Sequence, residues 1–187
     1  MCIRDRSWTM GNQLTFSGSG ELDNGMNVSL SFVLDQGDET TETSARSPFD
    51  SHSVTVSSDA LGTLVFSGEG GSSASSAIDT TAAGDLWDNG SGFGSPPSAE
   101  AGDNSMLYTL PSLMDDMSIK VGYSPGSAGG EGATSFAVGF TGVEGLSVDF
   151  GVGDTETIGT EAEQTVMKAS YAFGSFTVSA SNNEYDY

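Results

Sequence analysis

The sequence predicts an all-β protein, built as an antiparallel sheet of about ten strands arranged in five hairpins. Three observations lead to this prediction. Apolar and polar residues alternate along many short segments, which is the side-chain period of a β-strand. Turn-forming residues separate these segments in pairs. The longest apolar runs are only a few residues, far below the roughly 20 residues of a membrane-spanning helix, and no amphipathic helix of comparable strength is present.

The first hairpin shows the pattern most clearly. In residues 13–22 the apolar residues and glycines occupy the even positions and polar residues the odd ones, and residues 26–34 repeat the alternation. Asp23-Asn24-Gly25 lies between them. Asn-Gly between two alternating segments predicts a two-residue type I′ turn, in which both central residues have positive φ. An antiparallel hairpin is therefore expected over residues 13–34.

Four further hairpins follow the same plan. Their paired segments are 51–57 with 63–68, 105–110 with 117–124, 134–141 with 146–153, and 164–173 with 176–181. Longer polar segments join successive hairpins, namely 36–50, 69–104, 125–133 and 154–163, and residues 181–187 read as the start of another polar loop. Short turns are therefore expected at one end of the sheet and long loops at the other.

Composition excludes several functions. Five Lys and Arg stand against 26 Asp and Glu, so the formal net charge is −21, which excludes a basic nucleic-acid-binding surface. A single cysteine, Cys2, excludes an internal disulfide framework. A single histidine, His52, argues against a histidine-rich metal site or a Ser-His-Asp triad, and we interpret it as an interfacial residue. We therefore expect neither an enzyme nor a cofactor.

The alternation fits two architectures, a soluble β-sandwich with its apolar face inside or a membrane barrel with its apolar face outside. The polar face is built mainly from Ser, Thr and Gly, whereas a water-exposed sheet surface usually carries many Lys and Glu. Strands of roughly nine residues also suit a bilayer crossing at about 45° tilt. These features favour the barrel. The alternative is a secreted acidic binding or adhesion domain of sandwich type, with or without calcium.

Two groups of residues have expected places in such a barrel. The wall facing water would carry the few charges of the polar face, Glu21, Asp35, Lys120, Asp149 and Lys168. The ends of the hydrocarbon-facing surface would carry aromatic residues, Tyr108, Tyr123, Phe140, Tyr171, Phe173 and Phe176. A barrel of this kind without open conductance, as in a specific transporter or an adhesin, is a third possibility.

Residues 13–34, residues 51–71 and the long segment that follows resemble the general diffusion porins of Gram-negative outer membranes, particularly those of alphaproteobacterial type. The resemblance spans nearly the whole chain from Gly11 onwards, so residues 11–187 are assigned to a partial barrel and residues 1–10 to a non-native N-terminal segment. It implies an antiparallel transmembrane β-barrel in outer-membrane lipid that passes small hydrophilic solutes and ions passively. It also implies a homotrimer, with no cofactor and no nucleic-acid partner.

In that family the third outer loop folds into the barrel and narrows it. The 36-residue segment 69–104 takes this place if the chain starts at the second of sixteen strands, so truncation at both ends is expected. The segment contains no Lys or Arg and six acids, Glu69, Asp79, Asp85, Asp88, Glu100 and Asp103. We expect these acids to favour cations. Residues 85–96 match a calcium loop only in part, because Trp87 and Pro96 occupy ligand positions, so no metal is expected.

Overall fold

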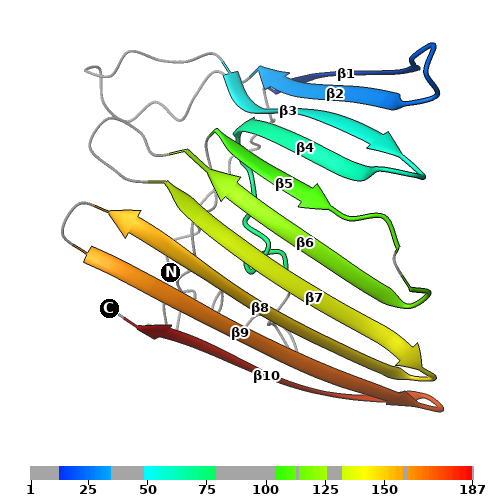
Figure 1. The fold of residues 1–187 in the computed structure, drawn as a ribbon, viewed down its shortest axis with the longest axis vertical. Helices are drawn as coiled ribbons and strands as arrows, with labels where there is room; N and C mark the ends of the chain where they lie inside the picture. Colours follow the sequence, from blue (N-terminus) through cyan, green and yellow to red (C-terminus); the bar gives the residue numbers. More distant parts are fainter. Residues whose placement is uncertain are drawn as a thin grey trace, which may run out of the picture.

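The computed structural model describes residues 13–34, 49–78, 104–112, 114–125, 132–157 and 160–186. These residues form one antiparallel sheet in which each of ten strands pairs with its neighbours in sequence (Figure 1). The strands are β1 (Leu14–Glu21), β2 (Asn27–Leu34), β3 (Phe49–Ser58), β4 (Gly62–Glu69), β5 (Ser105–Thr109), β6 (Met117–Ser124), β7 (Ala133–Val143), β8 (Leu146–Thr157), β9 (Thr160–Phe173) and β10 (Phe176–Asp186). The prediction of ten strands in five hairpins is confirmed. No helix in the described part of the chain is long and apolar enough to cross a membrane.

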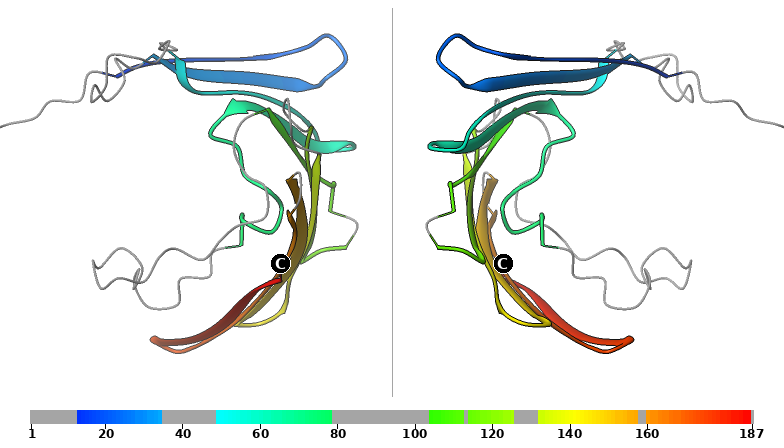
Figure 2. Two further views of the ribbon diagram at one scale, coloured as in Figure 1. Left: turned by 90° about the vertical axis from the view of Figure 1, so that its left-hand side faces the viewer. Right: turned by 90° about the vertical axis from the view of Figure 1, so that its right-hand side faces the viewer.

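The sheet curves about an axis so that it has a convex and a concave face, as Figure 2 shows. The short hairpin turns lie together at one end (Figure 1). The segment that leaves β4 runs on the concave side of the sheet (Figure 2). Because the described strands form a single curved sheet and not two stacked ones, the sandwich alternative is wrong.

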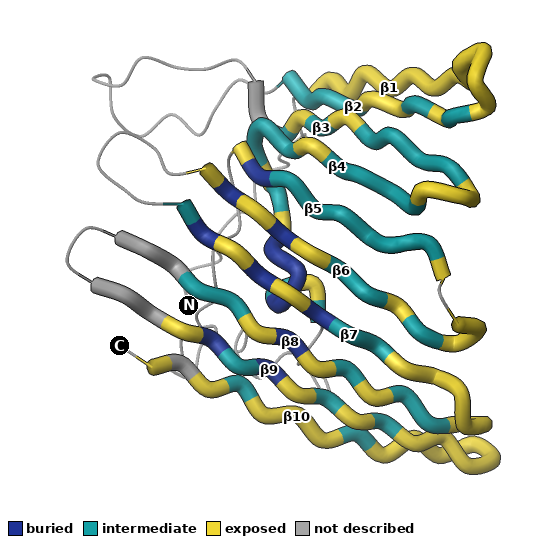
Figure 3. Tube along the Cα trace, viewed as in Figure 1, coloured by how far each residue is buried: buried dark blue, intermediate teal, exposed yellow. Residues whose placement is uncertain are grey.

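The two faces reverse the pattern of a soluble protein. Leu30, Phe66 and Val148 are 43%, 41% and 39% exposed, and they share the convex face. Apart from Val166, the buried strand positions are small or polar residues of the concave face, such as Ala137 and Ser135, and most of them lie on β6 to β9 (Figure 3). Large apolar side chains are normally the buried ones in water. A convex face that meets hydrocarbon accounts for the reversal.

The first turn differs from the predicted type I′ turn. Among the turn residues only Gly25 has a positive φ, 80°. The Gly25 amide donates to the Leu22 carbonyl at 2.9 Å, and the Leu22 amide donates to the Met26 carbonyl at 2.7 Å. Asp23 therefore belongs to a three-residue loop, a type I turn closed by a glycine bulge. This loop needs one residue with positive φ, so Asn24 keeps an ordinary backbone.

Two segments that we predicted as loops are strands. β8 and β9 pair without interruption from Asp154 opposite Glu163 to Thr157 opposite Thr160, where a long connection was expected. β10 continues to Asp186, which stands opposite Glu163, although residues 181–187 were predicted to leave the sheet. The polar composition of these segments marks the end of the apolar surface. It does not mark the end of the strands, because backbone pairing continues into water.

Alanine at Gly62 is expected to destabilise the protein more than alanine at Gly25. Both glycines have positive φ, 79° and 80°, so each substitution costs about 1–2 kcal/mol for left-handed backbone. A Cβ at Gly62 would also overlap the carbonyl oxygen of Thr109, whereas a Cβ at Gly25 meets no atom within 4 Å. Urea unfolding of the protein in detergent micelles measures the difference. Equal midpoints for the two variants would contradict the packing at Gly62.

Candidate functional site

The concave wall is lined by hydroxyl groups on its first five strands. Ser17, Ser31, Ser53, Ser67 and Ser105 stand opposite one another in successive strands from β1 to β5. A hydroxyl group donates and accepts hydrogen bonds without net charge. This row of serines is therefore polar and uncharged.

The charged wall residues lie mainly on β6 to β9. Asp149 stands directly opposite Lys168, so the structure brings these two predicted residues together. The Asp149 carboxylate lies over Gly139, with Oδ1 2.7 Å from the position a Cβ would take there, and it accepts a hydrogen bond from Ser147 Oγ at 3.3 Å. The absence of a side chain at Gly139 leaves room for the carboxylate.

The other predicted wall residues are separate from this pair. Lys120 on β6 stands opposite Thr109 and Ala137. Glu21 is exposed at the turn end of β1. No group of three potential metal-ligating side chains occurs within the described ranges.

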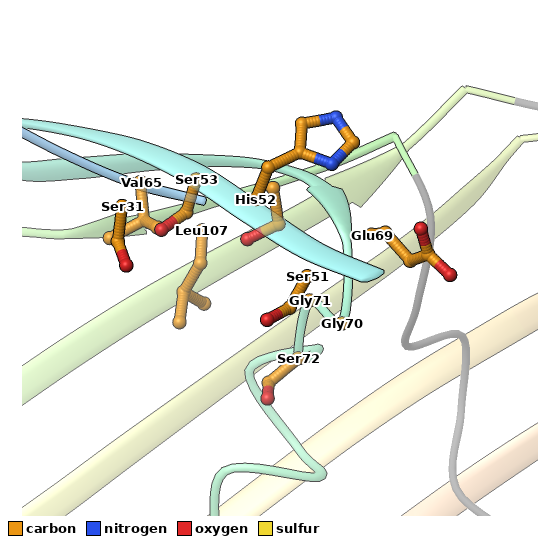
Figure 4. A pocket seen from close by; sticks show the side chains of 11 residues that line it. Ser31, Ser51, His52, Ser53, Val65, Glu69, Gly70, Gly71, Ser72 and Leu107 are labelled. Carbon is orange, nitrogen blue, oxygen red and sulfur yellow. The ribbon is translucent and has the colours of Figure 1, made fainter. Parts of the chain in front are cut away.

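Of the six predicted constriction acids, Glu69 alone lies in the described part of the chain. It is the last residue of β4 and is half-buried. It borders a cavity of about 340 Å³ whose lining includes Ser31, Ser53 and Ser72. His52 also belongs to the lining, and its ring points away from the serine side chains (Figure 4). The remaining predicted acids lie outside the described residues, namely Asp35, Asp79, Asp85, Asp88, Glu100 and Asp103.

The chain leaves β4 through Gly70, which has a φ of 73°, and forms a compact turn on the concave face. We call residues 73–78 the inward segment. Ser73, Ala74 and Ser75 are 4%, 0% and 0% exposed. The Ala77 amide donates to the Ser73 carbonyl at 3.1 Å, and the Ser76 amide donates to Ser73 Oγ at 3.0 Å. These bonds hold the turn in one shape.

Four wall residues receive the inward segment, and we call them the seat: Gly122 of β6, Ser135 of β7, Gly151 of β8 and Gln164 of β9. The Ala74 amide donates to Ser135 Oγ at 2.8 Å, and Ser75 Oγ donates to Gln164 Oε1 at 3.1 Å. A Cβ at Gly122 would lie 3.1 Å from the Ala74 nitrogen, and one at Gly151 would lie 3.1 Å from Ser75 Cα. The two glycines therefore allow the close approach.

Sequence reasoning missed the seat. Its residues are small or uncharged, and the partners in the two hydrogen bonds are 61 and 89 positions apart in the chain. One signal was present, because glycine within a strand often marks a place where another backbone comes close. Gly122 and Gly151 both fall in the polar register of their strands, where such an approach is possible.

The convex face carries aromatic residues at its turn end. Tyr171, Phe173 and Phe176 form a row of stacked rings, with centroids 6.0 and 5.8 Å apart. The Tyr108 hydroxyl donates to the Leu61 carbonyl in the turn between β3 and β4. Aromatic side chains, and amphipathic ones such as tyrosine in particular, are typical of a membrane–water interface.

At the opposite end of the sheet, several residues in the register of the convex face are acidic. Asp154 follows Val152 on this face and accepts hydrogen bonds from the amide and the hydroxyl of Thr134, each at 2.7 Å. Glu163 and Glu184 lie in the same register on β9 and β10 and are exposed. These three acids lie on the strand ends that extend beyond the predicted strands. The apolar surface is thus a band bounded by rings at one end and by carboxylates at the other.

Comparisons with known proteins agree with this architecture. The profile of the Gram-negative porin family matches residues 4–187. Crystal structures of variants of the porin from Rh. blastica are similar in fold, with TM-scores of 0.50 and 0.51 at 14% sequence identity, covering 93% of this chain and 74% of the porin chain. No curated protein sequence matches the chain.

The fold and the reversed faces define the class, a partial antiparallel β-barrel of the bacterial outer membrane. The chain belongs to the Gram-negative porin family. This membership places it in the outer membrane and points to a channel protein and not to an enzyme.

Proposed function

We propose that the chain forms the wall of a water-filled channel through which small hydrophilic solutes and ions diffuse passively, with a preference for cations. The observation that supports the channel is the reversal of the two faces. Large apolar side chains such as Leu30 and Val148 are exposed on the convex face, and serine hydroxyls line the concave face. A wall that is apolar outside and polar inside is what a channel in lipid requires.

The proposed cation preference rests on charge. The chain carries a net charge of −21, and segment 69–104, which we propose as the constriction, contains six acids and no base. Selectivity in a channel follows from its width and from charges placed where an ion sheds part of its water. The described wall offers the two bases Lys120 and Lys168 against this charge, and Lys168 stands opposite Asp149. Assembly as a homotrimer belongs to the proposal and rests on the family resemblance alone.

Neutralising two of the proposed constriction acids tests the cation preference. The double variant Asp85→Asn/Asp88→Asn, made in the full-length protein, is expected to lower the cation-over-anion permeability ratio by about twofold at low salt. The effect should shrink at 1 M salt, because the Debye length falls to about 3 Å. Reversal potentials across planar bilayers under a KCl gradient measure the ratio.

A matched control removes the same charge elsewhere. Asp59→Asn/Asp115→Asn neutralises two exposed acids in the short turns, and this variant should keep the wild-type reversal potential. Equal shifts in both double variants would assign the preference to total charge and reject segment 69–104 as the filter. A full-length wild-type protein that inserts but does not conduct would reject the channel itself.

A further inference from the structure

We propose that Gln164 is a positioning residue of the pore. It holds the inward segment on the wall and so fixes the position of residues 73–78 on the concave face. This inference rests on the proposed function, because the position of the segment matters only if the concave side is the conduction path.

The evidence begins with the surroundings of Gln164. Its side chain is 2% exposed, and both ends of its amide are engaged. Oε1 accepts a hydrogen bond from Ser75 Oγ at 3.1 Å, and Nε2 donates to Asn183 Oδ1 at 2.9 Å. An amide that is buried and bonded at both ends has one favoured orientation.

These bonds connect three parts of the chain. Ser75 belongs to the inward segment, Gln164 to β9 and Asn183 to β10. Asn183 stands opposite Val166, the next concave position after Gln164 on β9. Gln164 therefore ties the segment to two strands at once, and the orientation of its amide depends on β10.

A second anchor acts independently of Gln164. The Ala74 amide donates to Ser135 Oγ on β7 at 2.8 Å, two strands away from β9. With both anchors in place the segment is fixed at two points, so it cannot rotate on the wall. Loss of the Gln164 anchor leaves the Ser135 contact as a pivot, and the segment gains freedom while the sheet stays paired.

Ser75 and Gln164 are both buried, so the hydrogen bond between them is shielded from water. No buried side-chain nitrogen or oxygen in the described residues lacks a hydrogen-bond partner. Loss of the Gln164 side-chain amide would leave the Ser75 hydroxyl with Ser73 Oγ of its own segment, at 3.2 Å, as a hydrogen-bonding neighbour. The hydrogen bond from Ser75 to β9 is then lost, while the bond from the Ala74 amide to Ser135 Oγ remains, so the segment is held at one point and not at two.

Gln164→Leu tests the inference, because leucine is similar in size to glutamine but has no amide and so removes both hydrogen bonds. Hydrogen–deuterium exchange of the peptide that covers residues 70–78 should become about threefold to tenfold faster, which corresponds to one lost hydrogen bond. Peptides from β7 and β8 should exchange as in the wild type. In planar bilayers the variant should conduct more and discriminate less between cations and anions, since the inward segment, which belongs to the proposed constriction, loses its fixed place.

Two further variants separate positioning from a general structural role. Ser75→Ala removes the same hydrogen bond from the other side and leaves the wall intact, so it also serves if Gln164→Leu does not fold. The effect of the double variant should be smaller than the sum of the two single effects, because both changes remove the hydrogen bond between Ser75 and Gln164. Ser170→Ala, on the concave face of β9, is the control and should change neither exchange nor selectivity.

The outcomes distinguish the two proposals. Unchanged exchange of residues 70–78 and unchanged reversal potential in a conducting Gln164→Leu channel, or in a Ser75→Ala channel, would overturn the positioning role and leave the channel standing. Additive effects in the double variant would also overturn it. Absence of conductance in the wild type would overturn the proposed function instead.

Discussion

Lysine at Val148 is expected to prevent insertion into lipid, whereas lysine at the neighbouring Ser147 is expected to be tolerated. Val148 lies on the convex face, opposite Phe140 and Ala169, and is 39% exposed. A lysine at this depth of the band would face hydrocarbon at a cost of about 2–4 kcal/mol. Ser147 points to the concave side, where its hydroxyl contacts Asp149, so a lysine there meets water and a carboxylate. Folding into lipid vesicles, followed by heat-modifiable gel mobility, measures the inserted fraction.

A second pair of positions makes the test independent of β8. Leu30 and Ser29 on β2 stand on opposite faces, and Leu30 is 43% exposed. Lysine at Leu30 should impair insertion and lysine at Ser29 should not. Alanine at all four positions controls for loss of the original side chain. If lysine is tolerated equally on both faces, the convex face does not meet lipid.

The strands and their faces could be predicted because both depend on local sequence. The side-chain period of a strand is two, so the identity of alternate residues determines which face each one joins. Because Leu14 and Phe16 are apolar, all the remaining even positions of β1 were predicted to lie on the same face as these two residues. The placement of Phe66 and Val148 on the exposed face required one more step, the inference that the polar face with few charges was the inner one.

Turn geometry and strand ends were less predictable. Asn24-Gly25 signals a hairpin in either turn type, and the choice depends on whether Asp23 joins the loop. The extension of β8 to Thr157 and of β10 to Asp186 depends on backbone pairing with β9, which polar side chains do not prevent in water. Composition therefore located the apolar band correctly and the strand ends incorrectly.

The seat could not be predicted from local patterns at all. Ser75 and Gln164 are 89 positions apart, and neither belongs to a motif. Of the six acids predicted for the constriction, the five beyond Glu69 lie outside the described residues, so their place stays a prediction. Asp149 and Lys168 were assigned to the wall from their register, and the same register explains why they meet.

Valine at Gly151 is expected to displace the inward segment without any change at Gln164. A Cβ at Gly151 would lie 3.1 Å from Ser75 Cα and 2.8 Å from Ile78 Cδ1. The isoleucine can rotate away, but the Ser75 backbone can give way only by moving off the wall. Overpacking of this kind costs about 1–3 kcal/mol, which is comparable to the hydrogen bonds that hold the segment. We therefore expect larger single-channel conductance, weaker cation preference and faster hydrogen exchange in residues 70–78.

Valine at Gly20 is the matched control, because the position lies on β1 and a Cβ there meets no atom within 4 Å. This variant should conduct and discriminate like the wild type. The comparison matters because both changes add the same side chain to a strand glycine, so a shared effect would reflect strand propensity alone. Wild-type conductance and exchange in Gly151→Val would show that the segment does not rest on β8. A channel altered only at Gly151 would show that the width of the pore depends on a glycine that carries no charge, since this residue decides how closely the inward segment can approach the wall at β8.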